Sequence, residues 1–281
     1  EKVYGGYIDN TARLAGARIL RRTTVKASVD FNHIRRYAYG EHPDIIADTY
    51  ETDKDSLRLE YFNPQAELNV FSIRTDSSKV KYDFSLLYNL LYQTSIYYQH
   101  QAGFKGQLGY DLDVFYAGLD LGYELNAITN VEDKFRHRAM IKPAISKRSE
   151  NWSFRLGLSL VADARYYDEN GQPREYKPKY FLHPDLNFRF SVIPGIFNMF
   201  VGLDGEYINN NASRVVYDNP YVVNYLNGIT SPADELYTML PTDVQLRVKG
   251  GFNGFANENT SYNVRLSYSM FEDMLFYINP I

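Results

Sequence analysis

Apolar and polar residues alternate with a period of two along most of this chain, and no other feature restricts its fold as much. Between 114 and 127, for example, Leu119 and Leu121 alternate with Asp120 and Gly122. Side chains on a β-strand point to opposite faces in turn, whereas an amphipathic helix needs apolar residues spaced by three and four. The pattern therefore predicts an all-β protein whose strands are apolar on one face and polar on the other.

The alternating runs predict about twelve strands, which are about twice as long as the mean of 5–6 residues in soluble proteins. They cover residues 4–19, 23–36, 55–75, 80–92, 99–110, 114–127, 137–147, 152–166, 179–192, 196–209, 243–255 and 259–271. The third run is expected to bend or break at Asn63-Pro64, because proline cannot donate a hydrogen bond to a strand ladder.

The connections between these runs alternate in length. Short ones, such as Leu20–Arg22 and Arg148–Asn151, are followed by longer ones at 37–54, 93–98, 128–136, 167–178 and 210–242. If consecutive strands are antiparallel neighbours, all longer connections lie at one end of the sheet, as in an outer-membrane barrel. We therefore predict a single barrel domain over 1–281, with long outer loops at 37–54, 167–178 and 210–242.

A soluble β-sandwich or a lipocalin-like barrel would also show alternation. Three features favour a membrane: the strand lengths suit tilted spans of about 9–11 residues, the connections alternate regularly, and aromatic residues gather at strand ends. The chain contains 26 Tyr and 17 Phe, with pairs such as Tyr97 and Tyr98 at strand ends. Aromatic girdles mark both membrane interfaces of such barrels. The expected fold is a transmembrane, antiparallel, up-and-down β-barrel.

We expect the apolar face to meet lipid and the polar face to line the interior. The lipid-facing set includes Leu119, Leu121, Leu156, Leu158, Val244 and Leu246. The candidate lumen-lining residues are Lys81, Asp120, Glu124, Arg155, Asp163, Arg165, Asp185, Arg189, Asp204, Glu206, Arg247, Lys249 and Arg265. Arg58 and Glu60 are placed in the interior with them. Two interpretations stay open: an interior cross-braced by paired charges, or a pore lining that biases permeation.

Several functional classes lack support. The formal net charge is −4, with 30 basic and 34 acidic residues, so nucleic acid is not an expected partner. The chain has no cysteine, which excludes disulfides and thiolate metal sites. Its five histidines form no close pair, and neither a GxSxG nor a phosphate-binding loop occurs. We expect no catalytic, metal or cofactor site, and a protein that is not an enzyme.

The order of several segments resembles a known family. Tyr4-Gly5-Gly6-Tyr7 precedes the first strand, Phe31 to Arg36 ends the first hairpin, and Phe115 to Tyr123 forms a later strand. In this order they are similar to TonB-dependent-receptor-like, or porin-like, outer-membrane β-barrel proteins of Bacteroidota. The resemblance covers most of the chain and implies a barrel in the bacterial outer membrane, with no catalytic residues.

Two functions follow as alternatives: a barrel that passes or takes up a solute, or a structural subunit of a larger outer-membrane complex without transport of its own. Expected partners are outer-membrane lipid and lipopolysaccharide, and other outer-membrane proteins that would contact the outer loops. After Phe271 the alternation is lost, and Asn279-Pro280 is a turn signal. We expect further strands beyond it, giving fourteen or more.

Overall fold

The computed structural model describes residues 7–37, 58–73, 78–93, 97–128, 135–167, 175–194, 196–211, 213–214, 218, 241–257 and 259–275. These residues form twelve β-strands: β1 (Ile8–Ile19), β2 (Thr23–Tyr37), β3 (Arg58–Ser72), β4 (Val80–Gln93), β5 (Tyr97–Asp111), β6 (Tyr116–Ile128), β7 (Phe135–Arg148), β8 (Trp152–Tyr167), β9 (Glu175–Ile193), β10 (Phe197–Ile208), β11 (Thr242–Asn257) and β12 (Thr260–Glu272). No helix in this part of the chain is long and apolar enough to span a membrane.

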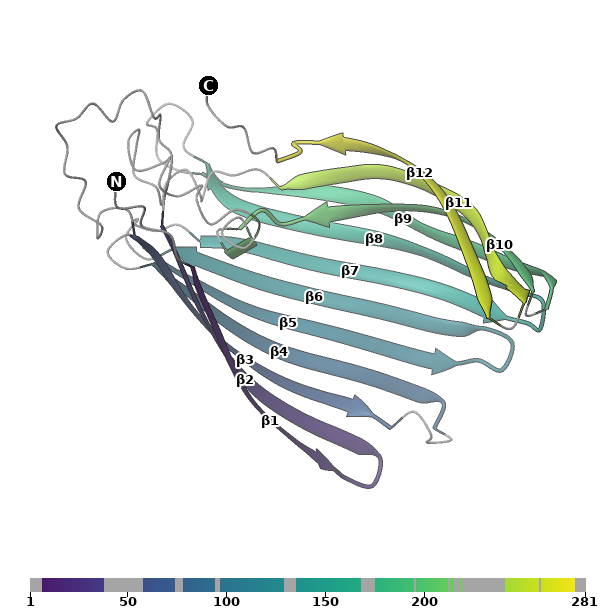
Figure 1. Cartoon of the computed structure of the whole chain (residues 1–281), viewed down its shortest axis with the longest axis horizontal. Helices are drawn as coiled ribbons and strands as arrows, with labels where there is room; N and C mark the ends of the chain where they lie inside the picture. The colour runs from purple at the N-terminus through teal and green to yellow at the C-terminus, as the bar shows by residue number, and fades with distance from the viewer. Residues whose placement is uncertain are drawn as a thin grey trace.

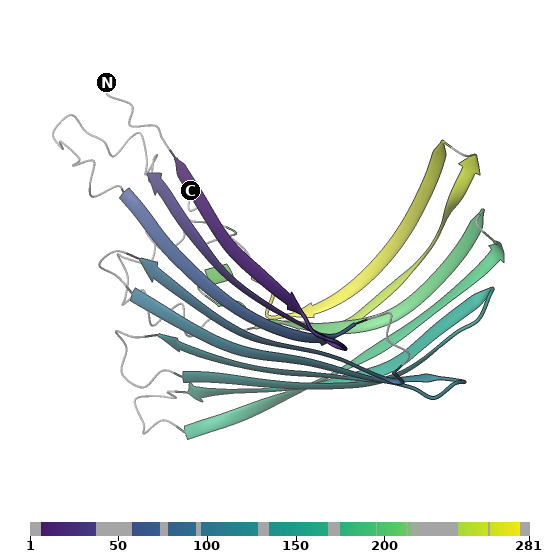
Figure 2. The same cartoon turned by 90° about the horizontal axis from the view of Figure 1, so that it is seen from below.

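All twelve strands belong to one antiparallel sheet, in which each strand pairs with its neighbours in sequence. This confirms the predicted up-and-down order. The strands lie side by side and curve into a trough, as Figures 1 and 2 show. Closure into a ring is not seen, because β1 and β12 form the two edges of the sheet and do not pair with each other.

The two ends of the sheet differ as the sequence predicts. Residues 20–22, 73–79, 112–115, 149–151, 194–196 and 258–259 connect the strands at one end, which we call the short-turn end. The connections 38–57, 129–134, 168–174 and 209–241 all leave the opposite, long-connection end. Residues 94–96 also belong to that end, but this connection is shorter than expected, since β4 and β5 extend toward each other.

Burial separates the two faces of the sheet. On β8, Leu156, Leu158 and Leu160 point away from the trough and are 41–45% exposed. Ser159 and Asp163 alternate with them on the concave face and are at most 8% exposed. The outward face is apolar along most strands, while the concave face is polar. A sheet that exposes a continuous apolar surface of this kind fits an outer-membrane barrel.

Proline interrupts the ladder of β3 without breaking the strand. Pairing with β2 is continuous through Phe31 and Pro64. On the other side, pairing with β4 passes directly from Phe62 to Gln65 and leaves Asn63 and Pro64 out. The missing N–H of proline therefore costs ladder contacts on one side only, and β3 does not break at this point.

Three expected orientations are wrong. Arg58 and Glu60 lie on the outward face, because they share the parity of Phe62 and Leu68 on β3. Val244 is only 1% exposed and faces the interior rather than lipid. An irregularity between Val244 and Leu246 shifts the register of β11 against both β10 and β12. The alternation of outward and inward side chains that holds at Val248 and Leu246 therefore does not extend to Val244.

We predict that Leu158→Arg destabilises the protein by about 2–4 kcal/mol, since the side chain lies outward near the middle of β8. Gln107→Arg is the matched control, because Gln107 faces the concave side opposite Asp120. Urea unfolding in phospholipid vesicles measures both. Equal effects of the two substitutions would contradict the assignment of faces.

Candidate functional site

The concave face borders a cavity of about 710 Å³. Strands from β2 to β11 contribute to its lining, which includes Asp30, Gln101, Glu124, Lys142 and Arg247. Amide and charged side chains make up about half of the lining residues, and apolar side chains such as Met140 and Val161 lie among them. The cavity therefore offers hydrogen-bonding groups to water and polar solutes.

A buried ion pair lies at the long-connection end of this face. Arg136 on β7 donates to both carboxylate oxygens of Asp163 on β8, at 2.9 and 3.1 Å. The side chains are 6% and 0% exposed. Arg136 also donates to the hydroxyl of Tyr207 from β10, whose ring packs edge-on against Phe181 at 5.0 Å. This arrangement fixes Tyr207 inside the trough.

β10 separates from β9 before it reaches Tyr207, although it stays paired with β11 as far as Ile208. Its pairing with β9 ends at Asp204 and Asp185, although β10 continues to Ile208. At Gly205 an added Cβ would lie 2.7 Å from the carbonyl oxygen of Val244 and 2.8 Å from the His183 ring. Only glycine therefore fits where β10 separates from β9.

The residues that follow continue into the trough and contact its opposite wall. We call residues 207–211 and 213–214 the inward segment. Asn209 donates to Glu124 on β6, Asn211 donates to Gln101 on β5 at 3.4 Å, and Ser213 donates its N–H to Gln99 at 3.0 Å. A short helical turn begins at Ser213.

The contact residues are themselves held in place by neighbouring strands. Glu124 forms an ion pair with Arg138 and accepts a hydrogen bond from Asn126 at 2.7 Å. Gln99 donates to Asn126 at 3.3 Å and is 2% exposed. The inward segment therefore rests on a polar network across β5, β6 and β7, at the long-connection end of the interior.

Two further networks lie deeper on the concave face. Asp185 accepts hydrogen bonds from Arg155 at 2.8 Å and pairs with Lys142 at 3.0 Å, and Arg155 also reaches Asp120 at 3.4 Å. Asp204 pairs with Arg247 at 2.6 Å and with Lys249. These pairs join adjacent strands or strands separated by one other, and they leave little net charge on the wall.

A histidine and a carboxylate bridge two strands that are not neighbours in the sheet. His183 on β9 and Asp243 on β11 lie 2.6 Å apart, between His183 Nε2 and Asp243 Oδ1. His183 is 1% exposed, and its Nδ1 has no hydrogen-bond partner among the described residues. The bridge joins β9 to β11 at the level where β10 separates from β9.

The structure places most of the predicted lumen residues on the concave face. Asp120, Glu124, Arg155, Asp163, Asp185, Asp204, Arg247 and Lys249 take part in the networks above. Lys81 and Arg189 share this face near the short-turn end, and Arg265 lies over the ring of Phe200 at 5.7 Å. Glu206 is half exposed and reaches Arg247. The side chain of Arg165 lies outside the described part of the chain.

Sequence reasoning missed Arg136, Tyr207 and Gln99. Arg136 and Gln99 have the parity of their inward neighbours. Arg136 lay just outside the expected strand, which was placed at 137–147, whereas β7 begins at Phe135. Tyr207 departs from strict alternation because it follows the register shift between Asp204 and Glu206, where β10 also separates from β9, and no local pattern marks that shift. Within the described ranges, no group of three or more His, Asp or Glu residues is arranged to hold a metal ion.

Comparison with known proteins supports the fold. A solved structure of the copper transporter OprC superposes with a TM-score of 0.58 at 10% sequence identity. The match covers 89% of this chain and 42% of that one, so the chain spans less than half of the OprC chain. No family model and no curated protein matches the sequence. At this identity the likeness shows the fold alone.

We predict that Asp163→Ala destabilises the protein by about 3–5 kcal/mol, because Arg136 would be left as an unpaired buried charge. Replacing both partners, as Arg136→Met with Asp163→Leu, should restore most of the stability. Lys79→Ala removes an exposed ion pair with Asp113 and should cost less than about 1 kcal/mol. Urea midpoints in vesicles give all three values, and a double variant as unstable as Asp163→Ala would contradict this account.

Proposed function

We propose that this chain forms the wall of an outer-membrane barrel that passes or takes up a polar solute along its concave face. The inward segment, anchored inside the trough, is the observation that carries the proposal. A structural wall has no need of a segment that crosses its interior, whereas a permeation path needs a constriction that selects what enters.

The proposed location is supported by the outward face. Large apolar side chains such as Leu14, Val201 and Leu266 are 53–78% exposed, and they extend over the whole sheet. The likeness to the OprC barrel fits the same location. For a water-soluble protein so large an apolar surface would cause aggregation.

The paired charges of the interior support a solute without strong net charge. The carboxylates Glu124, Asp185 and Asp204 each contact a basic side chain. Such a lining sets up little net field along the path. Hydrogen-bonding amides, among them Gln65, Asn89 and Gln101, remain at the cavity surface to replace water around a polar molecule.

We predict that weakening the inward segment widens the path. The triple variant Asn209→Ala, Asn211→Ala, Ser213→Ala removes side-chain contacts with Glu124, Gln101 and Gln99. Liposome swelling in neutral sugars of increasing size should therefore become faster and reach larger sugars.

Asn198→Ala is the matched control, because its hydrogen bond with Asn253 lies on the concave face at the short-turn end. It should leave swelling unchanged. If wild type and the triple variant, both folded, let no solute pass, the chain would be a structural subunit of a larger complex instead.

A further inference from the structure

The hydrogen-bonded wall is interrupted between β9 and β10. β9 covers Glu175–Ile193, but β10 pairs with it only from Asp185 onward. Residues 175–184 therefore have β8 on one side and, within the described ranges, no paired strand on the other. We call residues 175–184 the gap edge. It begins near the middle of the wall, where Pro184 pairs with Leu158, and extends toward the long-connection end.

Side-chain exposure identifies the gap edge as a free edge of the sheet. On β9 the outward Leu186 and Phe188 lie where β10 pairs, and they are 37% and 44% exposed. Leu182 and Tyr180 follow on the same face and are 62% and 67% exposed. Tyr268 on β12, at the end of the sheet, is also 67% exposed. A strand lying beside residues 180–182 would lower their exposure to the values of Leu186 and Phe188.

Two prolines encode the gap edge in the sequence of β9. Pro178 and Pro184 are six residues apart, so their missing N–H groups face the same side of the strand. Pairing with β8 continues through both prolines without interruption, so this side is the one away from β8. Proline on a free edge disfavours pairing with a further strand. The sequence therefore favours a gap edge that stays unpaired.

Apolar side chains line the inner side of the gap. Phe181 from β9 and Tyr207 from β10 are 5% and 8% exposed, and their rings meet edge-on with centroids 5.0 Å apart. Val161 belongs to the same cluster, and Met140 packs against it. Met140, Val161 and Tyr207 also border the cavity of about 710 Å³. The apolar cluster therefore connects the gap with the interior.

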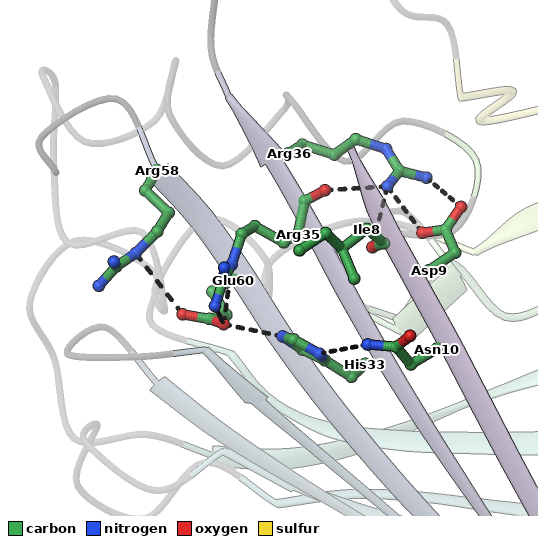
Figure 3. Close-up of polar contacts among 8 residues, drawn as sticks. All are labelled: Ile8, Asp9, Asn10, His33, Arg35, Arg36, Arg58 and Glu60. Atoms are coloured by element: carbon green, nitrogen blue, oxygen red, sulfur yellow. Dashed lines mark hydrogen bonds and ion pairs between the residues drawn. The ribbon is translucent and has the colours of Figure 1, made fainter. Parts of the chain in front are cut away.

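Few contacts of β9 cross the gap. Neighbouring strands elsewhere share a full ladder, and β1 and β2 add two hydrogen bonds from Arg36 to Asp9, at 2.7 and 2.8 Å (Figure 3). Among the described residues, the gap edge forms one side-chain hydrogen bond with the strands beyond it, between His183 and Asp243 at 2.6 Å. Parting the two sides therefore requires the loss of this bond and a movement of the Phe181 ring.

We propose that the gap is a lateral opening through which an amphiphile with a neutral polar head and a hydrocarbon tail moves between the interior and the surrounding lipid. At membrane depth, unpaired backbone groups are tolerated only where they are buried in protein or line a water-filled passage. Leu182 and Tyr180 outside the gap and Phe181 and Val161 inside it offer the tail an apolar route.

The cavity provides the environment for the head. Gln101 and Ser159 are at its surface and supply hydrogen-bonding groups. Asp185 and Asp204 at the same surface are already paired with basic side chains, which favours a head without charge. This inference goes beyond the proposed function, since it rests on the outer-membrane location alone and not on passage of a solute along the concave face.

Photo-crosslinking in phospholipid vesicles tests the proposal, with an alkyl glucoside that carries a diazirine at the end of its tail as the probe. In wild type the tail should label the inward Val161, as detected by mass spectrometry. The double variant His183→Cys with Asp243→Cys can be bridged across the gap by a bis-maleimide, because the chain has no cysteine of its own. Bridging should reduce the labelling of Val161 to background, whereas the same variant before bridging should keep it.

Asn198→Cys with Asn253→Cys is the matched control, because these residues pair between β10 and β11 at the short-turn end, away from the gap. Bridging this pair should leave the labelling unchanged. Phe181→Ala needs no bridge and should increase the labelling of Val161, since it removes the ring that fills the inner side of the gap.

Three results would overturn the proposal: no labelling of Val161 in any form, equal labelling with and without the bridge across the gap, or an equal loss in the control pair. Liposome swelling in neutral sugars should be the same for the bridged variant and wild type. If no form lets sugars pass while labelling still depends on the bridge, the proposed function fails and the lateral opening stands.

Discussion

The architecture depends on one constraint: a single layer of strands separates two different surroundings. In hydrocarbon every backbone N–H and C=O must be satisfied within the protein, and an antiparallel ladder between consecutive strands does this with short connections. Side chains then alternate between lipid and an aqueous interior. Strand length, order and the alternating connections of this chain all follow from that requirement.

The interior must in turn accommodate the charges that alternation places there. Several buried or half-buried carboxylates of the described residues contact a basic group on another strand, as Asp163 does with Arg136. Pairing across strands stiffens the wall and removes its net charge. Polar contacts also hold the inward segment. Tyr207, Asn209 and Ser213 form hydrogen bonds with side chains that neighbouring strands of the wall already hold in place.

Sequence periodicity predicted the strand order and most of the sidedness, because both depend on near neighbours in the chain. It failed for Val244, where an irregularity shifts the register, and for Arg58 and Glu60, which share the parity of outward Phe62 and Leu68 on β3. It also missed the inward segment. The contacts of Asn209 with Glu124 and of Ser213 with Gln99 join residues 85 and 114 positions apart, and such pairs leave no periodic trace.

The central claim is that the apolar face of the sheet meets lipid while the polar face lines water. Since the chain has no cysteine, single cysteines at 155–160 on β8 can each carry one fluorescent label in vesicles. Lipid-attached quenchers should quench the labels at 156, 158 and 160, and aqueous iodide those at 155, 157 and 159. Uniform quenching by iodide along the strand would contradict a membrane-spanning sheet.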